Sequence, residues 1–220
     1  PHAHGPITRG EPLREAVYER IVALICSGRY PPGAALTEAS LSRSLQVSRT
    51  PVREALLRLQ AEGVLQSALA RGFTVRQLIR RDAAELYPVL ATLESMAIRA
   101  TGSLPNATLN ALRTTAEELE GCVDPVRRWQ LDTSFHGTLA AAAGNEHLRA
   151  MIQQLRTNLS RYELAYMREV QTRVVADRQH REILAAMAAG DTDRAAALLE
   201  NHWHDGMRRV LEWLDDQAAN

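Results

Sequence analysis

Three predicted helices followed by two predicted strands occupy residues 13–75, and this order restricts the fold more than any other feature of the chain. Apolar residues recur every three or four positions in the helical segments, and Gly or Pro marks the breaks. The helices are predicted over residues 13–27, 37–45 and 48–62, and the strands over residues 64–67 and 73–75. This order predicts a winged helix-turn-helix, in which the strand hairpin forms the wing.

The third predicted helix has the residues best suited to reading DNA. Arg49 and Arg53 are four positions apart and share a face, whereas the apolar residues take the opposite face. Ser48 or Thr50 can cap the helix, because a hydroxyl there accepts a free backbone N–H. Guanidinium groups match guanine O6 and N7 in the major groove, and backbone N–H groups at a helix N-terminus suit phosphates. The alternative is a surface helix with two solvated arginines.

Charge is divided unevenly along a chain of zero formal net charge. Residues 1–80 contain 11 Arg and 6 Glu, and residues 81–220 contain 15 Arg and 20 acidic residues. A basic first part fits a nucleic-acid-binding module attached to a second, acidic module. No apolar run is long enough to cross a membrane, and Pro1–Gly10 lacks the apolar stretch of a secretory signal. Because Cys26 and Cys122 lack paired spacing, we expect reduced thiols and a cytoplasmic protein.

Beyond residue 81 the sequence shows only helical periodicity. Helices are predicted over residues 82–101, 106–120, 125–143, 146–167, 170–189 and 192–216. We therefore expect a mainly α protein with an N-terminal winged helix-turn-helix and an all-α antiparallel bundle. The expected parts are a flexible leader over residues 1–10, the DNA-binding domain over 11–76, a linker over 77–81, and a ligand-binding and dimerisation domain over 82–220.

Four polar residues of this second part lie in register with apolar neighbours: Asp132, His136, His180 and His202. Burying them without partners would be costly, and one divalent transition metal would supply a partner to all four. Zn²⁺ is the first choice, and Ni²⁺, Mn²⁺ or Fe²⁺ are alternatives. The competing interpretation is three separately hydrogen-bonded core histidines and an ion-paired Asp. Asp177, one turn before His180, either orients that imidazole or is a solvated acid.

Residues 13–75 resemble the DNA-binding domain of the GntR family. The matching motifs are Pro32-Gly33 with Leu36, the run Val47–Leu56, and Glu62-Gly63. The resemblance implies that Arg49, Thr50 and Arg53 contact a double-stranded DNA operator. It also implies that Arg71-Gly72 places the wing tip in the minor groove. A two-fold operator requires a two-fold protein, so a homodimer on a palindromic site is expected.

Residues 82–216 are similar to the FCD ligand-binding domain of the FadR-type GntR subgroup. The matching motifs are Leu131-Asp132, Phe135-His136, Gly144-Asn145, and His180 followed 22 residues later by His202. The resemblance implies that Asp132 and the three histidines hold a metal ion, and that a small carboxylate or related metabolite binds beside it. Many members have an Arg where this chain has Leu90, and the candidate replacements are Arg99, Arg113, Arg156 and Arg161.

These features together predict a dimeric, ligand-responsive transcription regulator without enzymatic activity. Repression of transcription is preferred over activation. A metal-dependent hydrolase is the alternative, since open positions on a bound ion could generate a metal hydroxide. The sequence shows no dedicated general base such as the Glu of H-E-x-x-H, and a winged helix on a hydrolase needs a separate explanation. A purely helical interaction module leaves the helix that carries Arg49 and Arg53 unexplained.

Overall fold

A computed structural model of the chain describes residues 13–68, 72–169 and 174–219. The predicted leader over residues 1–10 and the wing residue Arg71 lie outside the described residues. The chain forms two compact units, one ending at Leu78 and the other beginning at Ile79. Among the described helices, none is long and apolar enough to cross a membrane. The predicted fold class, mainly α with a winged helix-turn-helix first, is confirmed.

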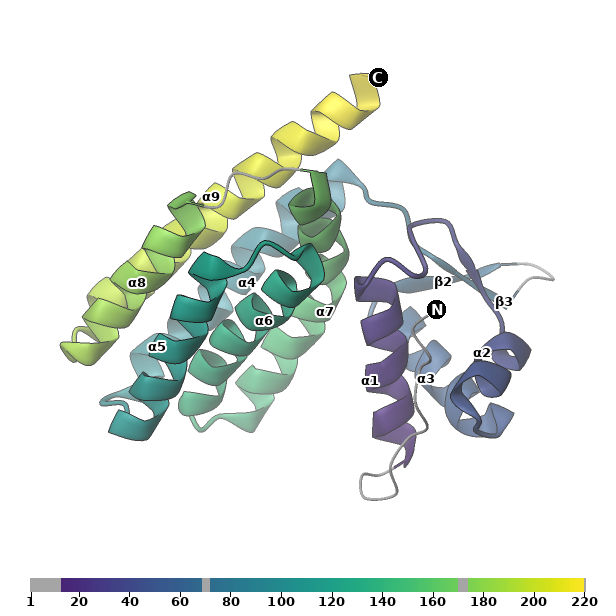
Figure 1. Ribbon diagram of the computed structural model, residues 1–220, viewed down its shortest axis with the longest axis horizontal. Coiled ribbons are helices and arrows are strands. Elements are labelled where there is room, and N and C mark those ends of the chain that lie inside the picture. The colour runs from purple at the N-terminus through teal and green to yellow at the C-terminus, as the bar shows by residue number, and fades with distance from the viewer. Residues whose placement is uncertain (1–12, 69–71, 170–173, 220) are drawn as a thin grey trace. The chain divides into compact units, whose positions relative to one another are not determined.

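The first unit contains three helices and a small antiparallel sheet (Figure 1). Its elements are α1 (Leu13–Cys26), β1 (Ala35–Leu36), α2 (Glu38–Leu45), α3 (Arg49–Ala61), β2 (Leu65–Ala68) and β3 (Gly72–Val75). The sheet order is β1-β3-β2, so the predicted hairpin gains a third strand. Sequence reasoning missed β1 because two residues are too few to show a strand period.

The core of the first unit fixes which face of α3 is free. Val52, Leu56 and Leu59 of α3 are fully buried, together with Val17 and Ile21 of α1. Apolar side chains at these spacings form one face of the helix, which therefore packs inward. The opposite face, with its arginines, is left on the surface.

The second unit consists of helices that run side by side (Figure 1). They are α4 (Arg80–Thr101), α5 (Asn106–Gly121), α6 (Pro125–Ala142), α7 (Glu146–Glu169), α8 (Val174–Ala188) and α9 (Thr192–Ala219). Each was predicted from periodicity, and apart from the start of α8, which borders residues outside the described ranges, every end lies within three residues of the predicted one. Helix α6 packs against α4, α5 and α7, and helix α8 packs against α5 and α9. This arrangement brings residues from distant parts of the chain to one interior.

The start of α4 corrects the predicted linker over residues 77–81. Helix α4 already begins at Arg80, where the sequence predicted a helix from Asp82. The backbone N–H of Ile79 donates to the Tyr162 hydroxyl at 3.1 Å, and that hydroxyl lies 3.2 Å from the Ile79 carbonyl oxygen. Arg80 also pairs with Asp215 of α9 at 2.8 Å. These contacts anchor the chain to the helical unit two residues earlier than periodicity indicates.

Candidate functional site

The four residues predicted as metal ligands lie together inside the helical unit. Asp132 and His136 come from α6, His180 from α8 and His202 from α9, and all four are buried. Each offers one ligand atom, and these atoms all lie within 4.8 Å of one another. His180 Nε2 lies 3.4 Å from both His136 Nε2 and Asp132 Oδ1. The helical spacing of Asp132 and His136 therefore places two donors on the interior face of one helix.

A carboxylate of α4 sets the orientation of one of these histidines. Glu94 Oε2 lies 2.7 Å from His136 Nδ1, and it also accepts a hydrogen bond from Trp203 Nε1 at 2.9 Å. Because a carboxylate accepts hydrogen bonds, Nδ1 of His136 carries the proton. The lone pair of Nε2 is then directed toward His180 and Asp132. Carboxylate–histidine pairs of this kind orient metal ligands in proteins.

The side-chain amide of Gln179 orients His202 in the same way. Gln179 Nε2 donates to Asp205 Oδ2 at 2.8 Å, which leaves Gln179 Oε1 to face His202 Nδ1 at 3.1 Å. The amide oxygen can only accept, so Nδ1 of His202 carries the proton and Nε2 has the lone pair. Two imidazoles are thus held in the tautomer that a metal ion requires, with their free nitrogens toward the cluster.

Arg156 of α7 lies between the two buried carboxylates beside the cluster. Its Nη2 is 3.0 Å from Asp132 Oδ2, and its Nη1 is 3.5 Å from Glu94 Oε1. Burial alone would lower the pKa of Arg156, but the negative charges of Glu163, Glu94 and Asp132 outweigh it and raise the pKa. This guanidinium was a candidate for ligand binding by sequence. In the structure it is engaged with the carboxylates that surround the cluster.

The protonation states of Asp132, His180 and His202 match those that metal ligands need. Burial would raise the pKa of Asp132, but the neighbouring His136, the hydrogen bond with His180 and the charge of Arg156 hold that pKa well below its usual value. Burial lowers the pKa of His180, and it lowers that of His202 further with the help of the other two imidazoles. An ionised carboxylate beside neutral imidazoles is the ligand form that binds divalent transition metals.

The four ligand atoms are therefore of the types that bind a metal ion, and the widest of their separations is slightly larger than a bound ion allows. Metal–ligand bonds of about 2.1 Å keep any two ligand atoms within roughly 4.2 Å of each other. Ligand atoms spread over as much as 4.8 Å would have to move together by some tenths of an ångström. Side-chain rotations about fixed helices can supply a movement of this size.

A small cavity of about 80 Å³ borders the cluster. Its walls include Asp132 and His202 together with Tyr87, Glu163 and Arg209. Pockets for drug-sized ligands are several hundred Å³, so this cavity suits a much smaller molecule. Because two of its walls belong to the cluster, a molecule inside it would lie next to a bound ion.

Glu163 of α7 is a buried acid on the wall of this cavity. Only 5% of the residue is exposed, and neither carboxyl oxygen has a hydrogen-bond partner among the described residues. Burial raises the pKa of Glu163 to about 7, against the opposing attraction of Arg156. A buried carboxyl group without a partner is costly, so this position calls for an explanation beyond packing.

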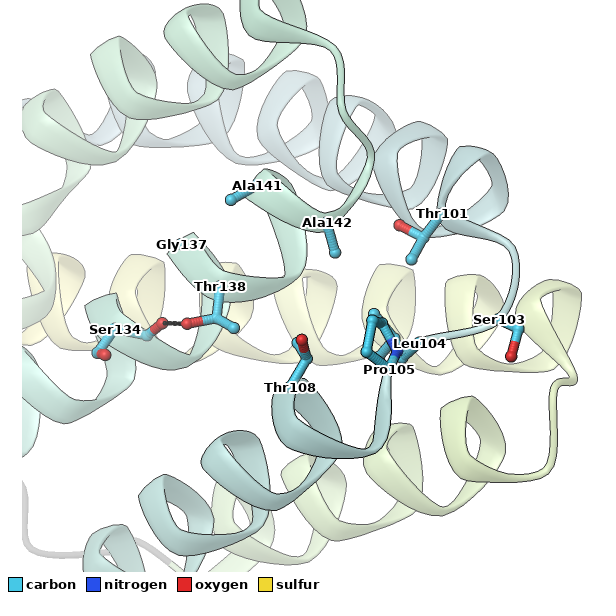
Figure 2. A pocket seen from close by; sticks show the side chains of 10 residues that line it. All are labelled: Thr101, Ser103, Leu104, Pro105, Thr108, Ser134, Gly137, Thr138, Ala141 and Ala142. Carbon is cyan, nitrogen blue, oxygen red and sulfur yellow. Dashed lines mark hydrogen bonds between the residues drawn. The ribbon is translucent and has the colours of Figure 1, made fainter.

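A larger cavity, of about 610 Å³, lies where the end of α4 meets the start of α5 and the second half of α6 (Figure 2). None of the side chains that line it is ionisable. Its polar groups are the hydroxyls of Thr101, Ser103, Thr108, Ser134 and Thr138. The Thr138 hydroxyl already donates to the Ser134 carbonyl oxygen at 2.8 Å. The cavity beside the cluster therefore has the stronger chemistry for an ionic ligand.

The remaining arginine candidates are placed away from the cluster by their own contacts. Arg99 is exposed and pairs with Asp193 and Glu200, and Arg113 is exposed beside Asn110. Arg161 is buried but contacts Asn158, one turn earlier in its own helix. None of these three lines the small cavity that the described residues form around the cluster.

Asp177 has neither of the two roles considered for it from the sequence. It is buried and forms an ion pair with Arg128, which is buried as well. The pair joins α8 to α6, and Arg128 Nη1 also donates to the Leu119 carbonyl oxygen of α5. Asp177 therefore holds two ligand-bearing helices together through a partner that the sequence did not indicate.

Sequence reasoning missed the polar residues that support the cluster from outside. Glu94 is in register with Leu90 and Ile98 of α4, and Glu163 with Leu159 of α7, and all three of these apolar residues are buried. Gln179 adjoins His180 and lies four residues before Ile183, which is buried as well. A search for charged residues within apolar helical stripes would have found the two glutamates. It would not have shown which histidine each one meets.

The candidate DNA-reading residues lie at the exposed start of α3. Ser48, Arg49, Thr50 and Arg53 are all exposed, and Arg53 Nε is 3.7 Å from Glu38 Oε1. Ser48 occupies the N-cap position with extended backbone, but its side chain makes no capping hydrogen bond, contrary to expectation. Thr50 lies inside the helix and is not the cap. The hydroxyls and guanidinium groups of this turn are therefore directed to the surface.

Gly72, predicted to help place the wing tip, has a structural reason to be glycine. It begins β3 with φ of +81°, a conformation that L side chains rarely adopt. A Cβ atom there would lie 2.8 Å from the Leu36 carbonyl oxygen of β1. The glycine thus permits β3 to lie close to β1.

Comparison with known proteins gives the same two-part division. Residues 13–75 match the family of bacterial regulatory proteins, gntR family, and residues 85–205 match the FCD domain. The chain is 31% identical to the Nta operon transcriptional regulator of Aminobacter aminovorans, over 84% of this chain and 89% of that protein. It is 30% identical to the probable D-xylose utilization operon transcriptional repressor of Paenarthrobacter nicotinovorans, over 84% and 83%. The structure of E. coli McbR/YncC covers 93% of this chain and 100% of its own, with a TM-score of 0.85 and 25% identity.

A winged helix-turn-helix joined to a helical sensor unit defines a ligand-responsive, DNA-binding transcription regulator, and not an enzyme. The chain belongs to the GntR family, and its helical unit is an FCD domain. The relatives are likewise regulators, which gives no support to the hydrolase alternative.

Proposed function

We propose that the chain acts in the cytoplasm as a homodimer that represses transcription from a palindromic operator until a small carboxylate binds. Ser48, Arg49, Thr50 and Arg53 would contact the major groove, and Arg71-Gly72 the minor groove. The exposure of the first turn of α3 supports this role, since the apolar face of the helix is buried and Arg49 and Arg53 are exposed to solvent. A two-fold operator would be read by two copies of α3.

We further propose that Asp132, His136, His180 and His202 hold one divalent transition metal, with Zn²⁺ as the first choice and Ni²⁺, Mn²⁺ or Fe²⁺ as alternatives. The observation that carries this proposal is the pair of outer hydrogen bonds to Glu94 and Gln179, which direct imidazole lone pairs to one point. A metal bound by these residues supplies positive charge and open coordination positions for a carboxylate oxygen.

The connection between the two functions would pass through α4. Glu94 of α4 holds His136, and α4 begins at Arg80, next to the boundary between the two units. A carboxylate that draws α6, α8 and α9 closer together would change the position of Glu94 and so of α4. Allosteric control requires the effector to favour one of two arrangements, and a shift of α4 would supply the second arrangement.

The test of this coupling is operator binding with and without a panel of metabolite carboxylates. We expect one acid to change operator affinity by about 5- to 150-fold in the wild type, a typical allosteric range. His180→Ala should abolish the response while leaving binding without effector largely intact. His147→Ala, a change of an exposed histidine of α7, should keep it. A response of equal size in His180→Ala would show that sensing bypasses the cluster.

The proposed dimer is tested by sizing and footprinting on the same operator. We expect a mass of two chains in solution and protection of two half-sites about one helical turn apart. A stable monomer that protects one half-site would contradict the two-fold arrangement without affecting the metal proposal.

A further inference from the structure

The small cavity beside the cluster is lined by a carboxyl group, that of Glu163, which no described residue satisfies. Asp132 and His202 line this cavity, and both have partners in the cluster or behind it. Glu163 lines the same cavity, is 5% exposed, and has two carboxyl oxygens without a hydrogen-bond partner among the described residues. The residues of the cluster that line the cavity thus have hydrogen-bond or ion-pair partners, whereas Glu163 lacks one.

The neighbouring cation does not satisfy Glu163. Arg156 attracts this carboxyl group electrostatically, but its hydrogen bond and ion pairs go to Asp132 and Glu94. Arg156 Nη2 is taken by Asp132 and its Nη1 lies 3.5 Å from Glu94 Oε1, and no hydrogen bond or ion pair joins Arg156 to Glu163 among the described residues. A donor group of a molecule bound in the cavity would supply the partner that Glu163 lacks among the described residues.

We propose that Glu163 selects the effector by accepting a hydrogen bond from a hydroxyl or ammonium group of the bound molecule. This inference rests on the proposed function, in which the carboxylate of the same molecule binds at the metal. The cavity of about 80 Å³ limits the effector to a few non-hydrogen atoms between these two groups. The ligand class is then a small hydroxy acid or amino acid.

The charge of the site argues against other small acids. A plain monocarboxylate would leave Glu163 buried and without a partner, at the cost of an unmade hydrogen bond. A dicarboxylate would bring a second carboxylate next to Glu163, and the two groups repel each other when both are ionised. A hydroxyl or ammonium donor removes both costs, so one added donor should strengthen binding by about tenfold or more.

The experiment compares acids with one carbon skeleton on the full chain loaded with Zn²⁺. Calorimetry would measure the affinities of propionate, its 2-hydroxy and 3-hydroxy derivatives, and its 2-amino and 3-amino derivatives. We expect at least one derivative to bind about tenfold or more tightly than propionate. In Glu163→Leu this preference should disappear, because the acceptor is gone.

Two further variants make the result specific. Glu163→Gln keeps an acceptor oxygen without the charge, so a preference for a hydroxyl should survive in part and a preference for an ammonium should be lost. Glu163→Gln also keeps the test valid if Glu163→Leu fails to fold. Glu117→Leu, which changes an exposed glutamate of α5, should leave all affinities unchanged.

The possible outcomes separate the two proposals. If propionate and every derivative bind the wild type equally, a water molecule satisfies Glu163, and the inference is wrong while a carboxylate site at the metal stands. A preference that persists in Glu163→Leu also overturns it. If no acid of the panel, propionate included, binds the metal-loaded chain, the proposed carboxylate site itself fails.

Discussion

His136 Nδ1 lies 2.7 Å from a carboxylate oxygen of Glu94, so a residue of α4 determines which ring nitrogen a histidine of α6 turns toward the cluster. Glu94→Gln keeps the shape of the side chain but removes the charge that holds this proton on Nδ1. We expect metal affinity to fall about 10- to 100-fold, as for other residues that orient metal ligands. Competition with a chelator measures the affinity. Glu85→Gln, at an exposed position of α4, is the control, and an unchanged affinity in Glu94→Gln would contradict this role.

Removal of the metal should destabilise the helical unit. Without an ion, the carboxylate and imidazoles of the cluster face one another across the interior of a helical bundle. Metal present at about 1,000 times its dissociation constant would add about 4 kcal/mol to the free energy of unfolding. Chelator treatment should therefore lower the melting temperature, and elemental analysis should find about one metal per chain. Full metal content in both His180→Ala and His202→Ala would rule out the assigned ligands.

Loss of the arginines of α3 should weaken the recognition of sequence more than general attraction to DNA. Arg49→Ala or Arg53→Ala should each cost about 1–3 kcal/mol of specific binding if the guanidinium group contacts a guanine. Affinities for operator and scrambled duplex, measured at one salt concentration, separate the two effects. Arg29→Ala removes an exposed charge of the same unit outside α3 and should lower both affinities alike. An Arg49→Ala, Arg53→Ala double variant with wild-type operator affinity would remove α3 from the reading role.

Glu163 should make the metal-free protein less stable as pH rises. Because burial raises its pKa from 4.5 to about 7, the folded chain binds more protons than the unfolded chain between these values. The free energy of unfolding therefore falls as pH rises through this range, by up to about 3 kcal/mol, and the penalty is complete above about pH 7. Glu163→Gln has no such penalty, so its advantage over the wild type should grow from pH 5 to pH 8. Denaturant unfolding at both pH values measures this, with Glu117→Gln as the control. Parallel pH profiles of wild type and Glu163→Gln would contradict the buried acid.

The sequence predicted the helices well because each one buries a stripe of apolar residues along many turns. It missed β1, since Ala35–Leu36 is recognisable as a strand only through its pairing with β3. It placed the end of the linker too late, because Tyr162 and Asp215, which anchor Ile79 and Arg80, lie 83 and 135 residues away in sequence. Local periodicity contains no information about such contacts.

The same limit applies to the candidate site. Helical register indicates that Asp132, His136, His180 and His202 face an interior, and the structure brings their ligand atoms together. Register does not indicate the partner of each residue, so the outer contacts of Glu94 and Gln179 were not foreseen. Asp177 was misread for this reason, because its partner Arg128 lies 49 residues earlier in the chain.

The positions of the ligands along the chain have a consequence for biosynthesis. The buried core of the DNA-binding unit is complete at Val75, whereas the cluster needs residues from Asp132 to His202. Domains generally fold as units while the ribosome is still extending the chain, the N-terminal one first. We therefore expect a nascent chain to present a folded DNA-binding unit well before the sensor can exist. Each newly made regulator would pass through a stage in which it has the means to approach DNA and no means to respond to its effector.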